Sequence, residues 1–218
     1  MEIVKSTVNA SPFLGVFCVA TDDVLLLPNR IEAKELKNFE ILDTEIINVS
    51  VASSSLIGVF VAGLGNKFAL PYFAEKTEIK KFEENNLEVI ALNSSALGNL
   101  VALNRNGGIA SPLIGKKVVD KMQDFFGVEF LQKQVAGFDL PGAALTVTNK
   151  GFIVHPNIGK DEFSELEKFF KVNGSITTLN YGDPFVGNDI VANSNAAVVG
   201  ANTSGHELIR VDEGLRGE

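Results

Sequence analysis

The sequence predicts an α/β protein, a closed ring of five similar units with helices on the outside. Three observations predict this fold. A sequence motif that begins with glycine recurs five times along the 218 residues. Charged residues gather in the segments expected to be helices, and both ends of the chain are as apolar as its middle. Repeats with a period of 20–50 residues are typical of arrays and rings in which each unit buries its apolar face on the next.

The repeat is marked by five glycines at spacings of 43, 40, 44 and 45 residues: Gly15, Gly58, Gly98, Gly142 and Gly187. A proline closes four of the five copies, at Pro28, Pro71, Pro112 and Pro156. We interpret this register as a single domain, residues 1–218. Its units are approximately 1–44, 45–86, 87–129, 130–173 and 174–218.

Each unit is expected to contain a strand, a loop, a two-strand hairpin and a helix, in that order. The hairpin strands are short apolar runs separated by turn residues, for example at 21–23, 65–67 and 149–151. The helices are predicted over 32–40, 75–84, 116–126 and 160–171, where apolar residues stand three and four apart. These segments hold 24 of the 46 charged residues in 42 positions, so the helices face solvent and the strands lie inside.

Closure into a ring is predicted from the two ends of the chain. An open array of repeats needs polar end units. Here the first unit keeps Ile3, Val4 and Phe17, and the fifth keeps Ile190 and Val191. The simplest way to bury both flanks is to pack one against the other. A β-propeller is the alternative, but its blades have four strands and no regular helices.

Charge and composition exclude several classes of function. The net charge of -8 and a pI near 4.9 argue against an autonomous nucleic-acid-binding protein, and we expect no DNA partner. Residues 46–66 carry no charge, but polar residues divide them into two short apolar blocks, which fits two strands and not a membrane span. Residues 1–7 do not resemble a signal peptide. We therefore expect a cytoplasmic protein, acting as a monomer.

No residue pattern predicts a catalytic, metal or cofactor site. Cys18 is the only cysteine and stands in an apolar run, where a thiol is usually a small buried side chain. His155 and His206 have no second ligand at metal-binding spacing. The segment 108–117 has the wrong glycine spacing for a phosphate-binding loop. We expect no cofactor and no metal.

Several strings resemble the translation initiation factor 6 family, and the resemblance covers essentially the whole chain. They are Ser95-Ala96-Leu97-Gly98-Asn99, the run NKGFIVHP at 149–156, and the runs VGN at 186–188 and ANTS at 201–204. The resemblance implies a pentein, a ring of five ββαβ-type units about a pseudo-fivefold axis. The chain stops at Glu218 without the longer C-terminal extension of eukaryotic members, which favours the archaeal branch.

The resemblance implies a ribosome anti-association factor and not an enzyme. Such a factor binds the large ribosomal subunit, prevents premature joining of the small subunit, and takes part in maturation of the large one. The implied partners are chiefly a uL14-type ribosomal protein, with a nearby large-subunit protein and rRNA.

The family's docking face is implied at ten positions, which we expect together at the glycine-loop end of the ring: Asn66, Lys67, Leu97, Gly98, Asn99, Gly142, Ala143, Ala144, Gly187 and Asn188. Asn99 offers two N–H donors and an acceptor to a partner. Lys67 is expected to add a charge contact to rRNA or to an acidic patch. Val59 stands where many eukaryotic relatives have arginine, so one cationic contact of the family is missing.

An enzyme is the alternative function, because guanidine-modifying enzymes share the pentein fold. Those enzymes resemble one another in a cysteine nucleophile late in the chain, with a histidine and carboxylates at the ring centre. This chain has no cysteine after Cys18 and reads Ala201-Asn202-Thr203-Ser204 in that region. We therefore expect no hydrolase or deiminase activity on arginine derivatives.

Overall fold

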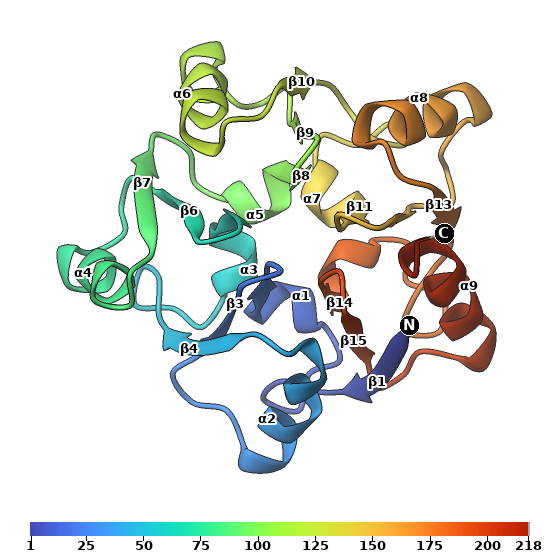
Figure 1. The fold of residues 1–218 in the computed structure, drawn as a ribbon, viewed down its shortest axis with the longest axis horizontal. Helices are drawn as coiled ribbons and strands as arrows, with labels where there is room; N and C mark the ends of the chain where they lie inside the picture. Colours follow the sequence, from blue (N-terminus) through green and yellow to red (C-terminus); the bar gives the residue numbers. More distant parts are fainter. Residues whose placement is uncertain (218) are drawn as a thin grey trace.

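The computed structural model describes residues 1–217 as a five-unit α/β ring. Five three-stranded sheets stand around a central axis, with longer helices outside them and one-turn helices close to the axis (Figure 1). This is the ring of five units that the repeat predicts and the pentein architecture that the family resemblance implies.

Each sheet combines a hairpin with one parallel strand. The middle strand of the sheet pairs antiparallel with its hairpin partner and parallel with the third strand. In spatial order the sheets are β2(Val19–Ala20)–β3(Val24–Pro28)–β4(Glu45–Val49), β5(Ala62–Leu64)–β6(Lys67–Pro71)–β7(Glu88–Leu92), β8(Val101–Asn104)–β9(Gly107–Ala110)–β10(Phe130–Gln132), β11(Leu145–Val147)–β12(Phe152–Val154)–β13(Gly174–Ile176) and β14(Ile190–Ala192)–β15(Ala196–Gly200)–β1(Glu2–Ser6). The middle strands are buried along almost their whole length, as expected of strands covered on both faces.

The third strand of every sheet joins one unit to the next. β4, for example, begins the second unit but pairs with β3 of the first. The fifth sheet takes its third strand from the N-terminus, because β1 pairs with β15 from Glu2–Ala196 to Ser6–Gly200. The two apolar ends of the chain therefore bury each other and close the ring. The sheets are offset by one strand from the units read in the sequence.

Five helices form the outer layer: α2 (Ala33–Phe39), α4 (Lys76–Glu84), α6 (Lys116–Phe126), α8 (Lys160–Phe170) and α9 (Gly205–Leu215). A short 3-10 helix, η1 (Glu40–Leu42), follows α2. Each outer helix buries at least one apolar side chain, and α6 buries three, Val119, Met122 and Phe126. The remaining faces carry charges, so the predicted division between a charged outside and an apolar inside is confirmed.

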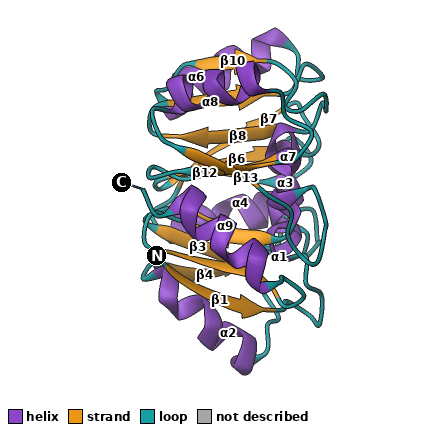
Figure 2. Ribbon diagram, turned by 90° about the vertical axis from the view of Figure 1, so that its right-hand side faces the viewer, coloured by secondary structure: helices purple, strands orange, loops and turns teal. Residues whose placement is uncertain are grey.

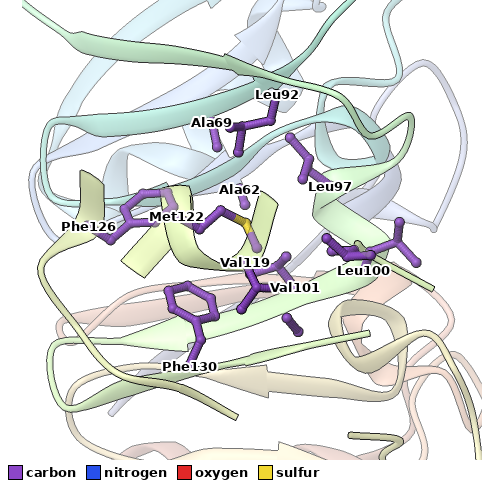
Figure 3. Close-up of a cluster of buried hydrophobic side chains, with 12 residues drawn as sticks. Ala62, Ala69, Leu92, Leu97, Leu100, Val101, Val119, Met122, Phe126 and Phe130 are labelled. Atoms are coloured by element: carbon purple, nitrogen blue, oxygen red, sulfur yellow. The ribbon is translucent and has the colours of Figure 1, made fainter. Parts of the chain in front are cut away.

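The core consists of wedges between neighbouring sheets. Figure 3 shows one of them, in which Met122 and Phe126 of α6 lie against Ala62 and Ala69 of the second sheet and Val101 of the third. Met122 is fully buried, and full burial of such a side chain contributes about 1.5–3 kcal/mol. Since every wedge draws on two sheets, each unit depends on its neighbours for its core.

Short helices around the axis are an element that the sequence patterns do not predict. They are α1 (Leu14–Phe17), α3 (Ile57–Phe60), α5 (Leu97–Leu100), α7 (Pro141–Ala144) and the 3-10 helix η2 (Val186–Asn188). The five repeat glycines, expected in loops, lie in these helices. One helical turn is too short to show a 3.6-residue period.

The ring has two different ends, which Figure 2 shows in side view. The inner-helix end carries α1, α3, α5, α7 and η2, the loops entering them, and the starts of the outer helices. Each hairpin runs directly from an inner helix, so its turn lies at the opposite, hairpin-turn end. No helix in residues 1–217 is both long and apolar enough to cross a membrane.

Candidate functional site

The five repeat glycines form a closed ring of backbone contacts at the inner-helix end. A Cβ atom on Gly98 would lie 1.8 Å from the carbonyl oxygen of Gly58, and one on Gly58 would lie 1.8 Å from that of Gly15. Gly142 meets Gly98, Gly187 meets Gly142, and Gly15 meets Gly187 in the same way. Only glycine allows such a close approach of one backbone to another. The glycines are therefore the contact points of the five units.

Some of the predicted docking residues lie on this ring and are partly exposed, and four of them also line a cavity on the axis. Gly98, Asn99, Gly142, Gly187 and Asn188 are partly exposed at the inner-helix end. The side chains of Asn99 and Asn188 make no hydrogen bond within residues 1–217, so their amide groups remain available to a partner.

Other predicted docking residues are buried. Leu97 and Ala144 are fully buried and Ala143 is 3% exposed. Leu97 belongs to the wedge beneath α6, and Ala144 packs with Phe152 in the next wedge. Their side chains support the surface and do not form it.

Asn66 and Lys67 lie at the opposite end of the ring, so the structure does not bring all ten residues together. Asn66 is in the turn between β5 and β6, and Lys67 is the first residue of β6. The ammonium of Lys67 donates to the carbonyl of Phe125 at 2.8 Å and lies 5.6 Å from the centre of that ring. Lys67 therefore holds the end of α6 against the second sheet. The predicted hairpin could have revealed this separation, because the turn of a hairpin lies at the opposite end from the residues that enter its first strand.

Exposed apolar side chains at the inner-helix end are a feature that the sequence reasoning missed. Seven large apolar residues are exposed in residues 1–217, and six of them lie in connections at this end: Phe13, Tyr72, Phe73, Leu113, Leu140 and Tyr181. Phe73 contacts Phe60 and Tyr72 edge-on, with ring centres 5.7 and 5.1 Å apart. Contiguous exposed apolar surface is typical of interaction sites, and Tyr72 and Phe73 supply such contiguity in the second unit.

The hairpin-turn end is closed by a polar network from four units. The carboxylate of Asp22 accepts from the amide of Asn149 at 2.7 Å and from the Ser194 N–H at 2.9 Å. Arg105 lies 3.6 Å from the same carboxylate and donates its backbone N–H to Asn149. Burial opposes ionisation of Asp22, but these hydrogen bonds and Arg105 outweigh it and lower the pKa of Asp22.

A cavity of about 130 Å³ runs along the axis between the two closures. It is lined by glycine backbone, by apolar side chains such as Ala20 and Val147, by the polar residues Asn99 and Thr146, and by Cys18. Burial, with a smaller contribution from Glu35, raises the pKa of the Cys18 thiol. Cys18 is the only titratable residue in the described lining. A buried, protonated thiol with no adjacent base is a poor nucleophile.

The two histidines, His155 and His206, belong to different units and lie outside the described lining of the axial cavity. His155 is buried between the rings of Phe138 and Phe185, and its Nδ1 accepts the N–H of Asn157 at 3.0 Å. Burial lowers the pKa of His155, against the opposing effect of Asp183. His206 is exposed in the first turn of α9. No group of His, Cys, Asp or Glu side chains within residues 1–217 is placed to hold a metal ion.

Comparison with known families decides the classification. The model of the eIF-6 family matches residues 3–214, nearly the whole chain and all five units. The chain belongs to the eIF-6 family. The family that the sequence resembles is thereby confirmed.

Similar members of the family include archaeal proteins named translation initiation factor 6. The protein of Staphylothermus marinus is 33% identical over 224 residues, which cover 100% of this chain and 99% of that protein. The protein of Pyrococcus horikoshii is 36% identical over 224 residues, covering 99% of each. The shared family and name support a role in translation initiation.

Solved structures with a similar arrangement include two enzymes. A dimethylarginine dimethylaminohydrolase matches with a TM-score of 0.44 and 14% identity, covering 93% of this chain and 73% of that one. The agmatine deiminase of C. jejuni matches with a TM-score of 0.41 and 14% identity, covering 87% and 72%. At this level of similarity no catalytic property transfers to this chain.

Proposed function

We propose that this protein binds the large ribosomal subunit and sterically prevents premature joining of the small subunit. Membership of the eIF-6 family places it among translation initiation factors. The observation that carries the finer proposal is the inner-helix end, where six exposed apolar side chains surround a rigid ring with free amide groups at Asn99 and Asn188.

Rigidity is what makes such a surface effective. Backbone contacts between the five glycines fix the inner helices, so little conformational entropy is lost when a partner docks on them. Exposed aromatic side chains such as Tyr72 supply large apolar contacts, and partly exposed amides supply directional ones. The partner that we propose is a uL14-type ribosomal protein, with a neighbouring large-subunit protein and rRNA. A bound ring would then occupy the surface needed by the small subunit.

We further propose that the protein acts in the cytoplasm as a monomer, without a cofactor, and contributes to maturation of the large subunit. The alternative, a guanidine-modifying enzyme, requires an activated thiolate. The only thiol is Cys18, buried in an apolar setting. Citrulline formation from arginine derivatives that disappears in Cys18→Ser would support the enzyme instead.

Co-sedimentation with purified large subunits through a sucrose gradient tests the proposal. Asn99→Arg places a bulky cation at the inner-helix end, and Asn66→Arg makes the same change at the hairpin-turn end. We expect Asn99→Arg to weaken binding by about 1–3 kcal/mol and Asn66→Arg to leave it unchanged. A subunit-joining assay should show the same order. Loss of binding in Asn66→Arg alone would assign docking to the other end.

A further inference from the structure

The third unit differs from the other four at the inner-helix end. In the other units the third residue of the outer helix is a glutamate that accepts backbone N–H groups from the loop entering the inner helix. Glu78, for example, accepts from Ala52 at 2.7 Å and from Ser53 at 2.9 Å. The other three are Glu35, Glu162 and Glu207. The equivalent residue of α6 is Val118.

Two unpaired cations stand beside Val118. Lys116 and Lys117 are the first two residues of α6, and both are exposed. Neither makes an ion pair or a hydrogen bond within residues 1–217. The first turn of α6 contains no acidic residue, unlike those of the other outer helices. Among the outer helices in residues 1–217, α6 alone has two cations and no carboxylate in its first turn, on a chain whose net charge is -8. Its first carboxylate, Asp120, follows in the next turn.

The surroundings of these lysines are uncharged and partly apolar. Residues 112–115 and the loop 93–96 contain no ionisable side chain, and Leu113 is 68% exposed. The connection is held in place by Gln132, whose amide donates to the carbonyls of Ser111 and Ile114. Positive side chains at a helix N-terminus oppose the helix dipole. Lys116 and Lys117 oppose the dipole of α6 without a contact that offsets this cost, and such departures from local preferences are typical of functional surfaces.

We propose that Lys116 and Lys117 contact the phosphate backbone of an RNA strand when the inner-helix end docks. This inference rests on the proposed function. Lysine is a compact point charge that suits phosphate oxygens. In the third unit, the loops 93–96 and 112–115 and the first turn of α6 contain no carboxylate that would repel a polyanion. In each of the other four units, the first turn of the outer helix contains a carboxylate. Lys67, for which an RNA contact was also expected, lies at the opposite end and donates to the carbonyl of Phe125, so its contact stays a separate prediction.

The salt dependence of binding to large subunits tests the inference. The variant is Lys116→Gln with Lys117→Gln. The matched control is Lys160→Gln, which changes the first residue of α8 beside Asp161 and Glu162. Each lost phosphate contact lowers the slope of log K against log salt by about 0.7–0.9. We expect a fall of about 1.4–1.8 in the double variant and none in the control. An unchanged slope in the double variant would overturn the inference.

Crosslinking identifies the chemical class of the partner. Because Cys18 is buried, a photo-crosslinker attached to Lys117→Cys should label that position alone. We expect an RNase-sensitive adduct with large subunits from Lys117→Cys, and none from Lys160→Cys. An adduct with a ribosomal protein would replace RNA by an acidic protein surface and overturn the inference. Failure of the unmodified protein to bind subunits would overturn the proposed function, whereas normal binding with an unchanged salt slope would overturn this inference alone.

Discussion

At the scale of single residues, glycine is required around the axis by space and not by backbone conformation. The five repeat glycines do not have positive φ values; their Cα atoms lie against carbonyl oxygens of the neighbouring unit. These five positions therefore have the same structural role, which is to let neighbouring inner helices come into backbone contact.

We predict that Gly98→Ala destabilises the fold by about 3 kcal/mol or more, because its Cβ would lie 1.8 Å from the backbone oxygen of Gly58. Gly205→Ala is the control, since Gly205 is helical and has open space around its Cα. We expect the control to be neutral or stabilising by about 0.5–1 kcal/mol. Chemical denaturation of both variants measures the difference, and equal stabilities would contradict the close-approach argument.

A buried carboxylate distinguishes the fifth unit. Asp189 is fully buried where the other units have Phe17, Phe60, Leu100 and Ala144. Its Oδ1 accepts from the amide of Asn180 at 2.6 Å, while its Oδ2 has no partner. The same amide donates to the carbonyl of Pro12, so Asn180 connects the fifth unit to the first.

We predict that Asp189 makes the stability of the ring depend on pH. Burial, with Asp183 and Glu207 nearby, raises the pKa of Asp189 from 3.8 to about 7. The folded state then binds more protons than the unfolded state, so the free energy of unfolding falls as pH rises from about 4 to about 7.

Asp189→Asn should remove this fall, leaving the variant more stable than the unmodified protein above pH 7. Thermal unfolding measured across that range checks the prediction. Asp23→Asn, at an exposed turn, is the control. Parallel pH profiles for the unmodified protein and Asp189→Asn would show that Asp189 is not the group responsible.

At the scale of elements, the outer helices hold the inner-helix end through their first turns. Glu78 is 8% exposed and receives three backbone N–H groups, from Ala52, Ser53 and Glu75. Ala52 and Ser53 both have positive φ values, a conformation that costs free energy in residues other than glycine. The carboxylate therefore stabilises a strained loop beside α3.

We predict that Glu78→Gln lowers stability by about 1–3 kcal/mol, because an amide N–H₂ replaces one acceptor of backbone N–H groups. Glu84→Gln, at an exposed ion pair with Lys80, should cost less than about 1 kcal/mol. Hydrogen exchange at the amides of Ala52 and Ser53 should accelerate only in Glu78→Gln. Unchanged exchange there would refute the role of the carboxylate.

At the scale of the whole molecule, stability depends on closing the ring. β1 completes the fifth sheet, and Met1 and Ile3 pack against the core between β14, β15 and α9. The terminal amine of Met1 lies 2.6 Å from Asp212 of α9. Because each wedge of core is shared by two sheets, opening one seam exposes apolar surface on both sides.

We predict that removing residues 1–6 causes a large loss of thermal stability. A circular permutant supplies the control: it joins residue 217 to residue 1 through a flexible linker and begins at Val128, after the exposed Gly127. The permutant keeps β1 beside β15 and should unfold in one cooperative transition near the temperature of the unmodified protein. Equal melting temperatures for the truncated and unmodified proteins would show that closure adds no stability.

Much of the architecture can be predicted from the sequence because the same unit is repeated five times along the chain. Repetition reveals the units, and apolar spacing and charge reveal which segments are strands and which are outer helices, as in 160–171. The uncapped ends predict closure. The strings around Asn99 and His155 indicate the family. All of these are local or periodic properties, and a linear pattern records them.

Exposure and pairing at the candidate surface required the tertiary structure. The placement of Asn66 and Asn99 at opposite ends of the ring could have been predicted from the hairpin, but the burial of Leu97 and Ala144 could not. Lys67 and Lys116 are both lysines, but only the packing of α6 on the second sheet leaves Lys116 free and engages Lys67. Exposure, pairing and contact with a neighbouring unit depend on residues some 40 positions away, and they are decided only when the five units close on one another.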